Sequence, residues 1–132
     1  MKCFNLEIAD SVAHISFIRP EKRNSMIREF WEELPALVND IDAGSKARVI
    51  VLSSTGPHFT SGIDVSLFGQ LAASDAPDKK TRDLQANAAF YDQVLRLQGT
   101  FSALEEARIP VLAAVQGGCI GGGLDLVTAC DM

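Results

Sequence analysis

The sequence predicts an α/β fold, in which short strands alternate with helices along the chain. Residues 4–8 and 12–18 alternate apolar and polar side chains around a turn, which is the pattern of a β-hairpin. Apolar residues then recur at helical spacing over residues 26–41, and residues 48–53 form the short apolar run of a buried strand. A second such run, Val111–Val115, leads through glycines into another helical pattern. This order of strands and helices is typical of an α/β architecture.

Composition limits the class of protein. A chain of 132 residues has the length of one domain and can bury a substantial core. The formal net charge of -5 argues against non-specific nucleic-acid binding, so we expect no nucleic-acid partner. Cys3, Cys119 and Cys130 are odd in number and lack metal-ligand spacing, which predicts neither a disulfide framework nor a metal site. Without a secretory signal or an apolar run of ~20 residues, we expect a cytoplasmic protein with no membrane partner.

The first helix should begin just after the proline-containing turn that ends the hairpin. Asn24 or Ser25 is a favourable N-cap for the helical pattern that starts at Met26. Pro35 interrupts this pattern and is expected to kink or split the helix, because proline cannot donate a backbone hydrogen bond.

The loop after the strand at 48–53 carries His58, Ser61 and Asp64, the residue types of a hydrolase triad. Ser61 is not in a Gly-x-Ser-x-Gly motif, and neighbours on one loop seldom converge, so this triad has little weight. A helix is predicted over Val65–Leu71, followed by a polar loop at 72–78.

A longer helical pattern runs from Leu84 to Leu104 and is weakened at Gly99. Its aromatic residues are expected to lie in the core. These are Phe90, Tyr91 and Phe101.

The glycine cluster after Val115 allows several interpretations. No register gives the dinucleotide motif Gly-x-Gly-x-x-Gly, and Leu124-Asp125 stands where a phosphate loop requires Lys and Ser/Thr. A tight turn that permits positive φ angles is one remaining possibility. The other is a set of unpaired N–H groups at a helix start, with the Asp125 carboxylate within about one turn.

Two motifs together resemble the crotonase (enoyl-CoA hydratase/isomerase) superfamily. They are Gly121-Gly122-Gly123-Leu124-Asp125-Leu126 after an Ala-Ala-Val-Gln-Gly strand end, and Phe59-Thr60-Ser61-Gly62-Ile63-Asp64 upstream. The resemblance covers essentially the whole chain and implies a crotonase-like ββα spiral. In that fold, residues 1–132 are the N-terminal part of a single domain, truncated after the helix start of the oxyanion hole, with the C-terminal half absent.

The resemblance also implies a site. The N–H groups of Ile63 and Gly122 would form an oxyanion hole, and Asp125 would be the general acid/base. Apolar walls are expected around Asp125, and the sequence leaves open whether they or the helix dipole dominate its pKa. The implied substrate-binding residues are Ser61, Gly62, Ile63, Asp64, Val65 and Gly122, with Lys22 and Arg23 near the coenzyme A phosphates.

Aspartate at 125, preceded by Gly-Gly-Cys-Ile-Gly-Gly-Gly, looks more like the Δ3,5-Δ2,4-dienoyl-CoA isomerases than the hydratases, which carry glutamate there. The function implied is isomerisation of dienoyl-CoA thioesters in fatty-acid β-oxidation, with no cofactor, since coenzyme A is part of the substrate. An enoyl-CoA hydratase remains an alternative. So does a non-catalytic acyl-CoA-binding fragment, because the second catalytic carboxylate of the family would lie beyond Met132. The full-length relatives imply a homotrimer or hexamer.

Overall fold

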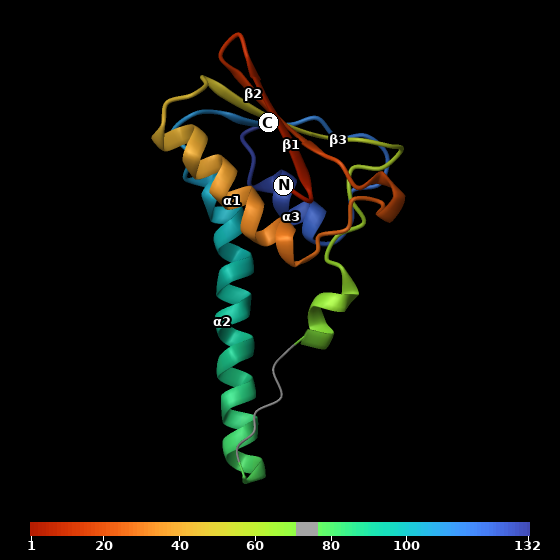
Figure 1. Cartoon of the computed structure of the whole chain (residues 1–132), viewed down its shortest axis with the longest axis vertical. Helices are drawn as coiled ribbons and strands as arrows, with labels where there is room; N and C mark the ends of the chain where they lie inside the picture. Colours follow the sequence, from red (N-terminus) through yellow and green to blue (C-terminus); the bar gives the residue numbers. More distant parts are fainter. Residues whose placement is uncertain (71–76) are drawn as a thin grey trace.

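A four-stranded sheet carries the helices on one of its faces in the computed structural model, which describes residues 1–70 and 77–132 (Figure 1). The strands lie in chain order and are β1 (Phe4–Ala9), β2 (Val12–Phe17), β3 (Val49–Ser54) and β4 (Val111–Ala113). β1 and β2 form the antiparallel hairpin, whereas β3 and β4 each add in parallel. The predicted α/β class is confirmed.

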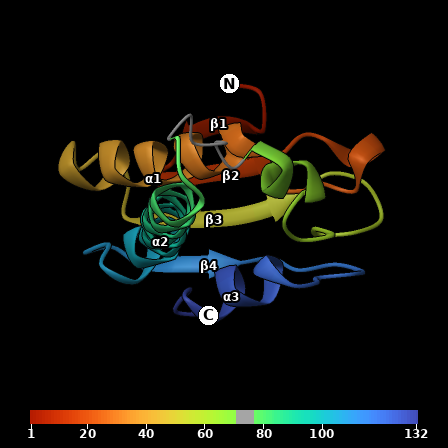
Figure 2. The same cartoon turned by 90° about the horizontal axis from the view of Figure 1, so that it is seen from below.

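Within the described residues, three α-helices and two 3₁₀ turns lie between the strands or after β4. They are η1 (Pro20–Lys22), α1 (Arg28–Ala43), η2 (Val65–Gln70), α2 (Lys79–Glu105) and α3 (Gly122–Thr128). Figure 2 shows α1 and α2 in front of the sheet, with α2 seen end-on beside α1. The N-terminal half of α2 extends well beyond the rest of the molecule (Figure 1).

The core lies between the sheet and the helices. Alternate residues of β2 face the helices, so Ala13, Ile15 and Phe17 are buried while His14 is exposed. Phe17 packs edge-on against Phe30 of α1, with ring centroids 5.4 Å apart. Fully burying a side chain of this size contributes roughly 1.5–3 kcal/mol. This packing holds the strand ends, and the loops that follow them, in fixed positions.

Pro35 lies inside α1 without splitting it, so of the two expected effects, a kink or a split, the split does not occur. Proline has no N–H, so the carbonyl of Trp31, four residues earlier, loses its helical donor. The buried Thr100 hydroxyl of α2 donates to that carbonyl instead, at 3.3 Å. A partner from α2 therefore compensates for the bond that proline removes.

The helix start was predicted wrongly. α1 begins at Arg28 after Ile27, without a side-chain cap, and neither Asn24 nor Ser25 caps it. Asn24 is buried with a φ of 51°, and its side chain bonds to backbone groups of neighbouring loops. A capping pattern in the sequence does not reveal that the side chain will form its hydrogen bonds with other loops instead of with the helix.

Other boundaries differ from prediction. β4 ends at Ala113, and Val115 is 45% exposed, so the predicted buried strand is shorter than expected. The segment from Val65 is a 3₁₀ helix, and Leu71 and residues 72–76 of the predicted loop lie outside the described residues. α2 continues through Gly99.

The aromatic residues of α2 separate into two groups. Phe101 packs against Trp31, with ring centroids 5.5 Å apart. Phe90 and Tyr91 are exposed, contrary to expectation, because this part of α2 projects from the body. None of the described helices is long and apolar enough to cross a membrane.

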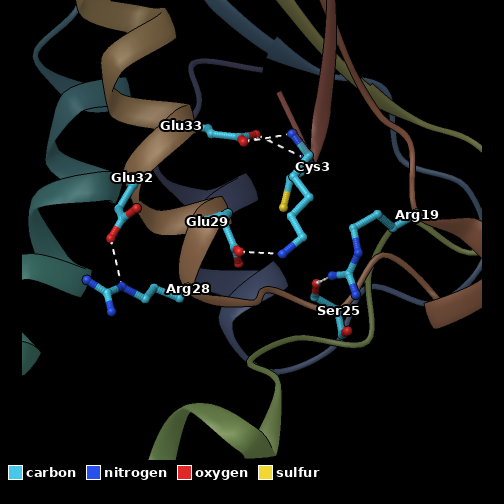
Figure 3. A network of polar contacts seen from close by, with 8 residues as sticks. Cys3, Arg19, Ser25, Arg28, Glu29, Glu32 and Glu33 are labelled. Atoms are coloured by element: carbon cyan, nitrogen blue, oxygen red, sulfur yellow. Dashed lines mark hydrogen bonds and ion pairs between the residues drawn. The ribbon is translucent and has the colours of Figure 1, made fainter. Parts of the chain in front are cut away.

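Carboxylates of α1 hold the beginning of the chain (Figure 3). The Glu33 carboxylate accepts the backbone N–H groups of Lys2 and Cys3, at 2.7 and 3.0 Å. The Lys2 ammonium also bonds to Glu29. These contacts fix β1 against α1, on the other side of α1 from Arg28 and Glu32 (Figure 3).

Candidate active site

The loops that follow β3 and β4 lie side by side. Neighbouring parallel strands end at the same edge of a sheet, so their following loops emerge together. The loops pair through a bridge between Thr60 and Cys119. The Thr60 N–H donates to the Gly118 carbonyl at 3.1 Å, and the Ile120 N–H donates to the Thr60 carbonyl at 3.2 Å. The two predicted motifs are thus in direct contact.

The loop after β3 is held on its other side by the segment before α1. Met26 donates its N–H to the Gly62 carbonyl at 2.8 Å and accepts the Asp64 N–H at 3.1 Å. Ile63, between these two residues, is the bridge partner of Met26. In a parallel bridge of this form, the middle residue directs its own N–H away from its partner. The Ile63 N–H therefore points away from Met26.

Two backbone donors remain free at this junction. Within the described part of the chain, neither the Ile63 N–H nor the Gly122 N–H donates a hydrogen bond. A β-carbon added at Gly122, which is buried, would lie 3.2 Å from Ile63 Cγ1, so the residues are adjacent. Unpaired N–H groups in such positions are rare and suit an external acceptor. The structure thus brings together the two residues predicted to donate to the oxyanion.

Close backbone approach explains two of the glycines. Gly62 has a φ of +86°, and a β-carbon there would lie 2.6 Å from the Ile120 carbonyl oxygen. A β-carbon at Gly123 would collide with the side chain of Thr60. Larger residues at either position would push the two loops apart.

Asp125 lies in the first turn of α3, one turn after Gly122. Its side chain is exposed, and its carboxylate makes no hydrogen bond or ion pair with the described residues. It lines a hollow of about 400 Å³ together with Glu105, Thr128, Cys130 and Asp131. A free carboxylate at such an opening is available to exchange a proton.

The apolar surroundings expected for Asp125 are absent from this hollow. Ile120 and Leu124 are 61% and 59% exposed, and neither they nor Ile63 line it. Successive helical residues point about 100° apart, so Asp125 shares its face with residues 128 and 129 rather than with Leu124.

Asp64 has a structural role in the loop. Its carboxylate accepts the Ser66 hydroxyl at 2.6 Å and N–H at 3.0 Å, and the Ser25 hydroxyl at 2.8 Å. These bonds, chiefly those from Ser66, lower the pKa of Asp64. Asp64 therefore stays ionised near neutral pH and braces the loop that carries Ile63.

No hydrolase triad forms. The His58 Nδ1 atom accepts the Gly118 N–H at 3.1 Å, and Asp64 bonds to Ser25 and Ser66. Within the described residues, no side-chain hydrogen bond or ion pair joins His58, Ser61 and Asp64 to one another.

The other predicted substrate-binding residues lie on or next to the loop that carries Ile63, and several of their side chains are exposed. The N–H of Ser61 donates to the Arg23 carbonyl at 2.9 Å, so the turn containing Lys22 and Arg23 touches this loop through its backbone. The Lys22 and Arg23 side chains are both exposed. Val65 is 82% exposed at the start of η2.

Sequence reasoning missed the roles of Asn24 and Thr60 in holding the loops together. The Asn24 side chain donates to the Thr55 carbonyl at 2.9 Å and accepts the Arg19 N–H at 2.9 Å. The buried Thr60 hydroxyl donates to the Asn24 carbonyl at 2.7 Å and accepts the Gly62 N–H at 3.1 Å. An asparagine directly after a proline turn is a weak signal for a left-handed backbone position, since asparagine tolerates it.

At this edge of the parallel sheet, two abutting loops present two free amide donors, an arrangement that can hydrogen-bond to a carbonyl or oxyanion oxygen. A family model described as Enoyl-CoA hydratase/isomerase matches residues 7–132, and the chain belongs to this family. The resemblance inferred from the two motifs is confirmed.

Individual relatives agree with this assignment. The chain is 45% identical over 123 residues to the mitochondrial Delta(3,5)-Delta(2,4)-dienoyl-CoA isomerase of Rattus norvegicus, covering 92% of this chain and 36% of the relative. It is 34% identical over 124 residues to a probable enoyl-CoA hydratase, echA6, of Mycobacterium bovis, covering 94% and 43%. A putative enoyl-CoA hydratase of Thermobifida fusca, solved in complex with CoA, matches with a TM-score of 0.78 and 33% identity, covering 99% and 48%.

The chain spans less than half the length of each of these proteins. The rat relative is described as mitochondrial. A cytoplasmic location therefore stays a prediction.

Proposed function

We propose that this chain binds acyl-CoA thioesters and forms part of an enzyme that isomerises 3,5-dienoyl-CoA to 2,4-dienoyl-CoA. The observation that carries the proposal is the pair of unpartnered N–H groups, Ile63 and Gly122, on adjoining loops. Family membership supports the CoA-thioester class, and the rat isomerase supports the choice of reaction.

The two donors act on the thioester oxygen. Removing a proton from C2 of the 3,5-diene delocalises the electron pair over the carbon chain and onto this oxygen. Hydrogen bonds aimed at the developing charge stabilise the resulting enolate, and one such donor is worth about 2.7–4 kcal/mol. The bridge to Met26 holds Ile63, and Gly122 is the first residue of α3, so little reorganisation accompanies the reaction.

Asp125 exchanges the proton. Isomerisation removes a proton at C2 and adds one at C6, so the overall composition of the substrate is unchanged. Asp125 serves one of these two positions, because its carboxylate is free and lies one helical turn from Gly122. A second carboxylate serves the other. Asp64 does not suit this role, since its hydrogen bonds favour the ionised form.

The test compares two substrates on the protein made from the complete reading frame that contains this chain. A 3,5-dienoyl-CoA should produce the conjugated 2,4-dienoyl absorbance, and a 2-enoyl-CoA should be hydrated slowly. Faster hydration than isomerisation would overturn the choice of reaction while leaving the family assignment unchanged.

Two other functions remain in competition. The mycobacterial relative, a probable enoyl-CoA hydratase, favours hydration. A non-catalytic acyl-CoA binder is favoured if the complete reading frame encodes no Glu or Asp in a strand–helix segment beyond Met132. Reading the coding sequence past Met132 separates this last possibility from both enzymes.

We also propose a homotrimer or hexamer for the complete protein, as the family resemblance implies. Light scattering after size-exclusion chromatography measures the molar mass directly. A monomer at concentrations that support activity would contradict this assembly.

A further inference from the structure

His58 holds the glycine loop, residues 114–121, through its side chain. Its Nδ1 atom accepts the Gly118 N–H at 3.1 Å, across 60 positions of the sequence. An imidazole nitrogen accepts a hydrogen bond only when it carries no proton, so in this arrangement the ring is neutral with its proton on Nε2. The residue is exposed, so solvent can deliver a second proton to the ring.

The backbone of His58 is fixed, which gives the imidazole a defined position. Its carbonyl accepts the Ser54 hydroxyl at 3.1 Å and the side-chain amide of Asn24 at 3.2 Å. The glycine loop also approaches this backbone closely, because a β-carbon added at Gly117 would overlap the Pro57 carbonyl oxygen. A fixed backbone beside a closely packed loop thus keeps the imidazole against its amide donor.

Gly118 joins the loops that follow β3 and β4. Its carbonyl accepts the Thr60 N–H at 3.1 Å, while its own N–H donates to His58. The Thr60 hydroxyl in turn accepts the N–H of Gly62, directly before Ile63, at 3.1 Å. The contact made by the imidazole is therefore two hydrogen bonds away from the segment that presents the Ile63 N–H.

The same junction leads to the second amide donor. The Ile120 N–H donates to the Thr60 carbonyl at 3.2 Å. The Ile120 carbonyl accepts the N–H of Gly123, the residue after Gly122, at 3.0 Å. A displacement of the glycine loop therefore changes the spacing between the N–H groups of Ile63 and Gly122.

A protonated imidazole cannot keep the contact with Gly118. Both ring nitrogens of a histidinium ion are donors, so an Nδ1–H group would face the Gly118 N–H. The two donors repel each other, and the amide loses its acceptor. Histidine is the side chain whose charge ordinarily changes between pH 5 and 8, so the contact should be lost within this range.

The charged residues around these loops leave the imidazole alone. They are Arg19, Glu21, Lys22 and Arg23 of the turn before α1, and Asp64 after Ile63. The Arg19 guanidinium donates to a backbone carbonyl, and the Asp64 carboxylate accepts two serine hydroxyls. Within residues 1–70 and 77–132, no hydrogen bond or ion pair joins any of these charges to His58. In the glycine loop the titratable group is Cys119, whose thiol stays neutral because burial raises its pKa.

We propose that His58 is a positioning residue that holds the two loops together only while its imidazole is neutral, and so makes the hydrogen bonds to the thioester oxygen dependent on pH. This inference rests on the proposed function, because that function places the oxygen at Ile63 and Gly122. The contribution of the carbonyl oxygen to acyl-CoA binding should fall as the pH is lowered from 8 to 5.5. Loss of one neutral hydrogen bond changes an equilibrium constant by about threefold to tenfold.

The state of the ring is measured first. Long-range ¹H–¹⁵N spectra show which imidazole nitrogen carries the proton, and the sequence contains only two histidines, His14 and His58. At pH 8, His58 should carry a proton on Nε2 and none on Nδ1. The variant His58→Asn assigns the signals, because it removes one of the two sets. A proton on Nδ1 at pH 8 would overturn the inference.

Binding measurements then isolate the carbonyl oxygen. Calorimetry gives the affinity of the chain for an acyl-CoA and for its thioether, in which CH₂ replaces the carbonyl group, at pH 8 and pH 5.5. Titration of the coenzyme A phosphates affects both ligands equally, so the ratio of the two affinities reports the oxygen. In the wild type this ratio should fall about threefold to tenfold between pH 8 and pH 5.5.

Asparagine at position 58 is the decisive variant. Its Oδ1 atom lies as many bonds from the backbone as Nδ1 of histidine and accepts a hydrogen bond at both pH values. His58→Asn should therefore keep the ratio of the wild type at pH 8 and lose its dependence on pH. His58→Leu has no acceptor, so its ratio should be low at both pH values. His14→Asn is the control: His14 bonds to Ser53 within the sheet, and the variant should retain the dependence.

The outcomes separate the two proposals. A pH dependence that persists in His58→Asn, or that is absent from the wild type, would overturn the role of His58 and leave the proposed function standing. Loss of the dependence in His14→Asn would do the same. Equal affinities for the thioester and the thioether at pH 8 would refute the placement of the oxygen, and with it both the proposed function and this inference.

Discussion

Replacing Gly62 by alanine tests whether the two loops are pressed together as described. The added β-carbon would lie 2.6 Å from the Ile120 carbonyl oxygen, which is a backbone atom and cannot rotate away. The loops must separate before ordinary contact, at 3.4 Å or more, is restored. The same residue has a φ of +86°, which L side chains rarely adopt.

The expected cost follows from these two effects. A left-handed backbone costs a non-glycine residue about 1–2 kcal/mol, and the collision adds to it, so Gly62→Ala should lower the free energy of unfolding by about 2–3 kcal/mol. Urea unfolding measures this as a lower midpoint with an unchanged slope. Acyl-CoA affinity should fall as well, because Ile63 moves with the loop.

Gly99→Ala is the matched control. No atom lies within 4 Å of a β-carbon added there, and the residue is inside α2. Alanine favours a helix over glycine by up to about 1 kcal/mol, so this variant should be as stable as the wild type or more stable. A Gly62→Ala protein whose stability and affinity match the wild type would refute the close approach of the two loops.

Three further predictions concern titratable groups. In the protein from the complete reading frame, Asp125→Asn should lower turnover about 10²–10⁴-fold and nearly preserve acyl-CoA affinity; equal turnover would exclude Asp125 as a proton carrier. The pKa of Asp64 is lowered from 3.8 by hydrogen bonds, chiefly from Ser66, so its stabilisation is fully present above pH 3.8 and lost as the pH falls through the lowered value. Urea unfolding of Asp64→Asn should therefore show a deficit near neutral pH that disappears in acid, and a deficit independent of pH would contradict this linkage. Burial raises the pKa of the Cys3 thiol to about 11, so a thiol reagent in mild alkali should modify Cys3 only as fast as the protein unfolds; rapid modification would argue against its burial.

The strands were predictable because their signal is local. In β2, the alternation of buried Ala13, Ile15 and Phe17 with polar residues identifies the strand and its inward face. The core face of α1 follows from its 3.6-residue spacing in the same way. Neither inference requires knowledge of a distant contact.

The errors occur where a distant partner decides the local structure. Asn24 looks like a helix cap in sequence, but its side-chain amide donates hydrogen bonds to carbonyl groups of the loop after β3. Pro35 looks like a helix breaker, and Thr100, far along the chain, supplies the missing donor. Phe90 and Tyr91 look like core residues, yet α2 extends past the body that would cover them.

Part of the site was predictable, because its two motifs are local patterns in the sequence. The motifs around Ile63 and Gly122 were recognisable, but only the structure shows that the two loops pair through Thr60 and Cys119. The prediction of apolar surroundings for Asp125 was wrong, because adjacent residues of a helix face different directions.

The most direct test of the central claim observes the two amide groups while a ligand binds. Two-dimensional ¹⁵N–¹H spectra of the chain are recorded with an acyl-CoA and with the matching thioether analogue, which lacks only the carbonyl oxygen. If the Ile63 and Gly122 N–H groups hold this oxygen, their proton resonances should move downfield with the thioester and not with the thioether. Resonances elsewhere that respond to the coenzyme A portion should move equally with both ligands. Equal shifts of the Ile63 and Gly122 amides with thioester and thioether would contradict the claim.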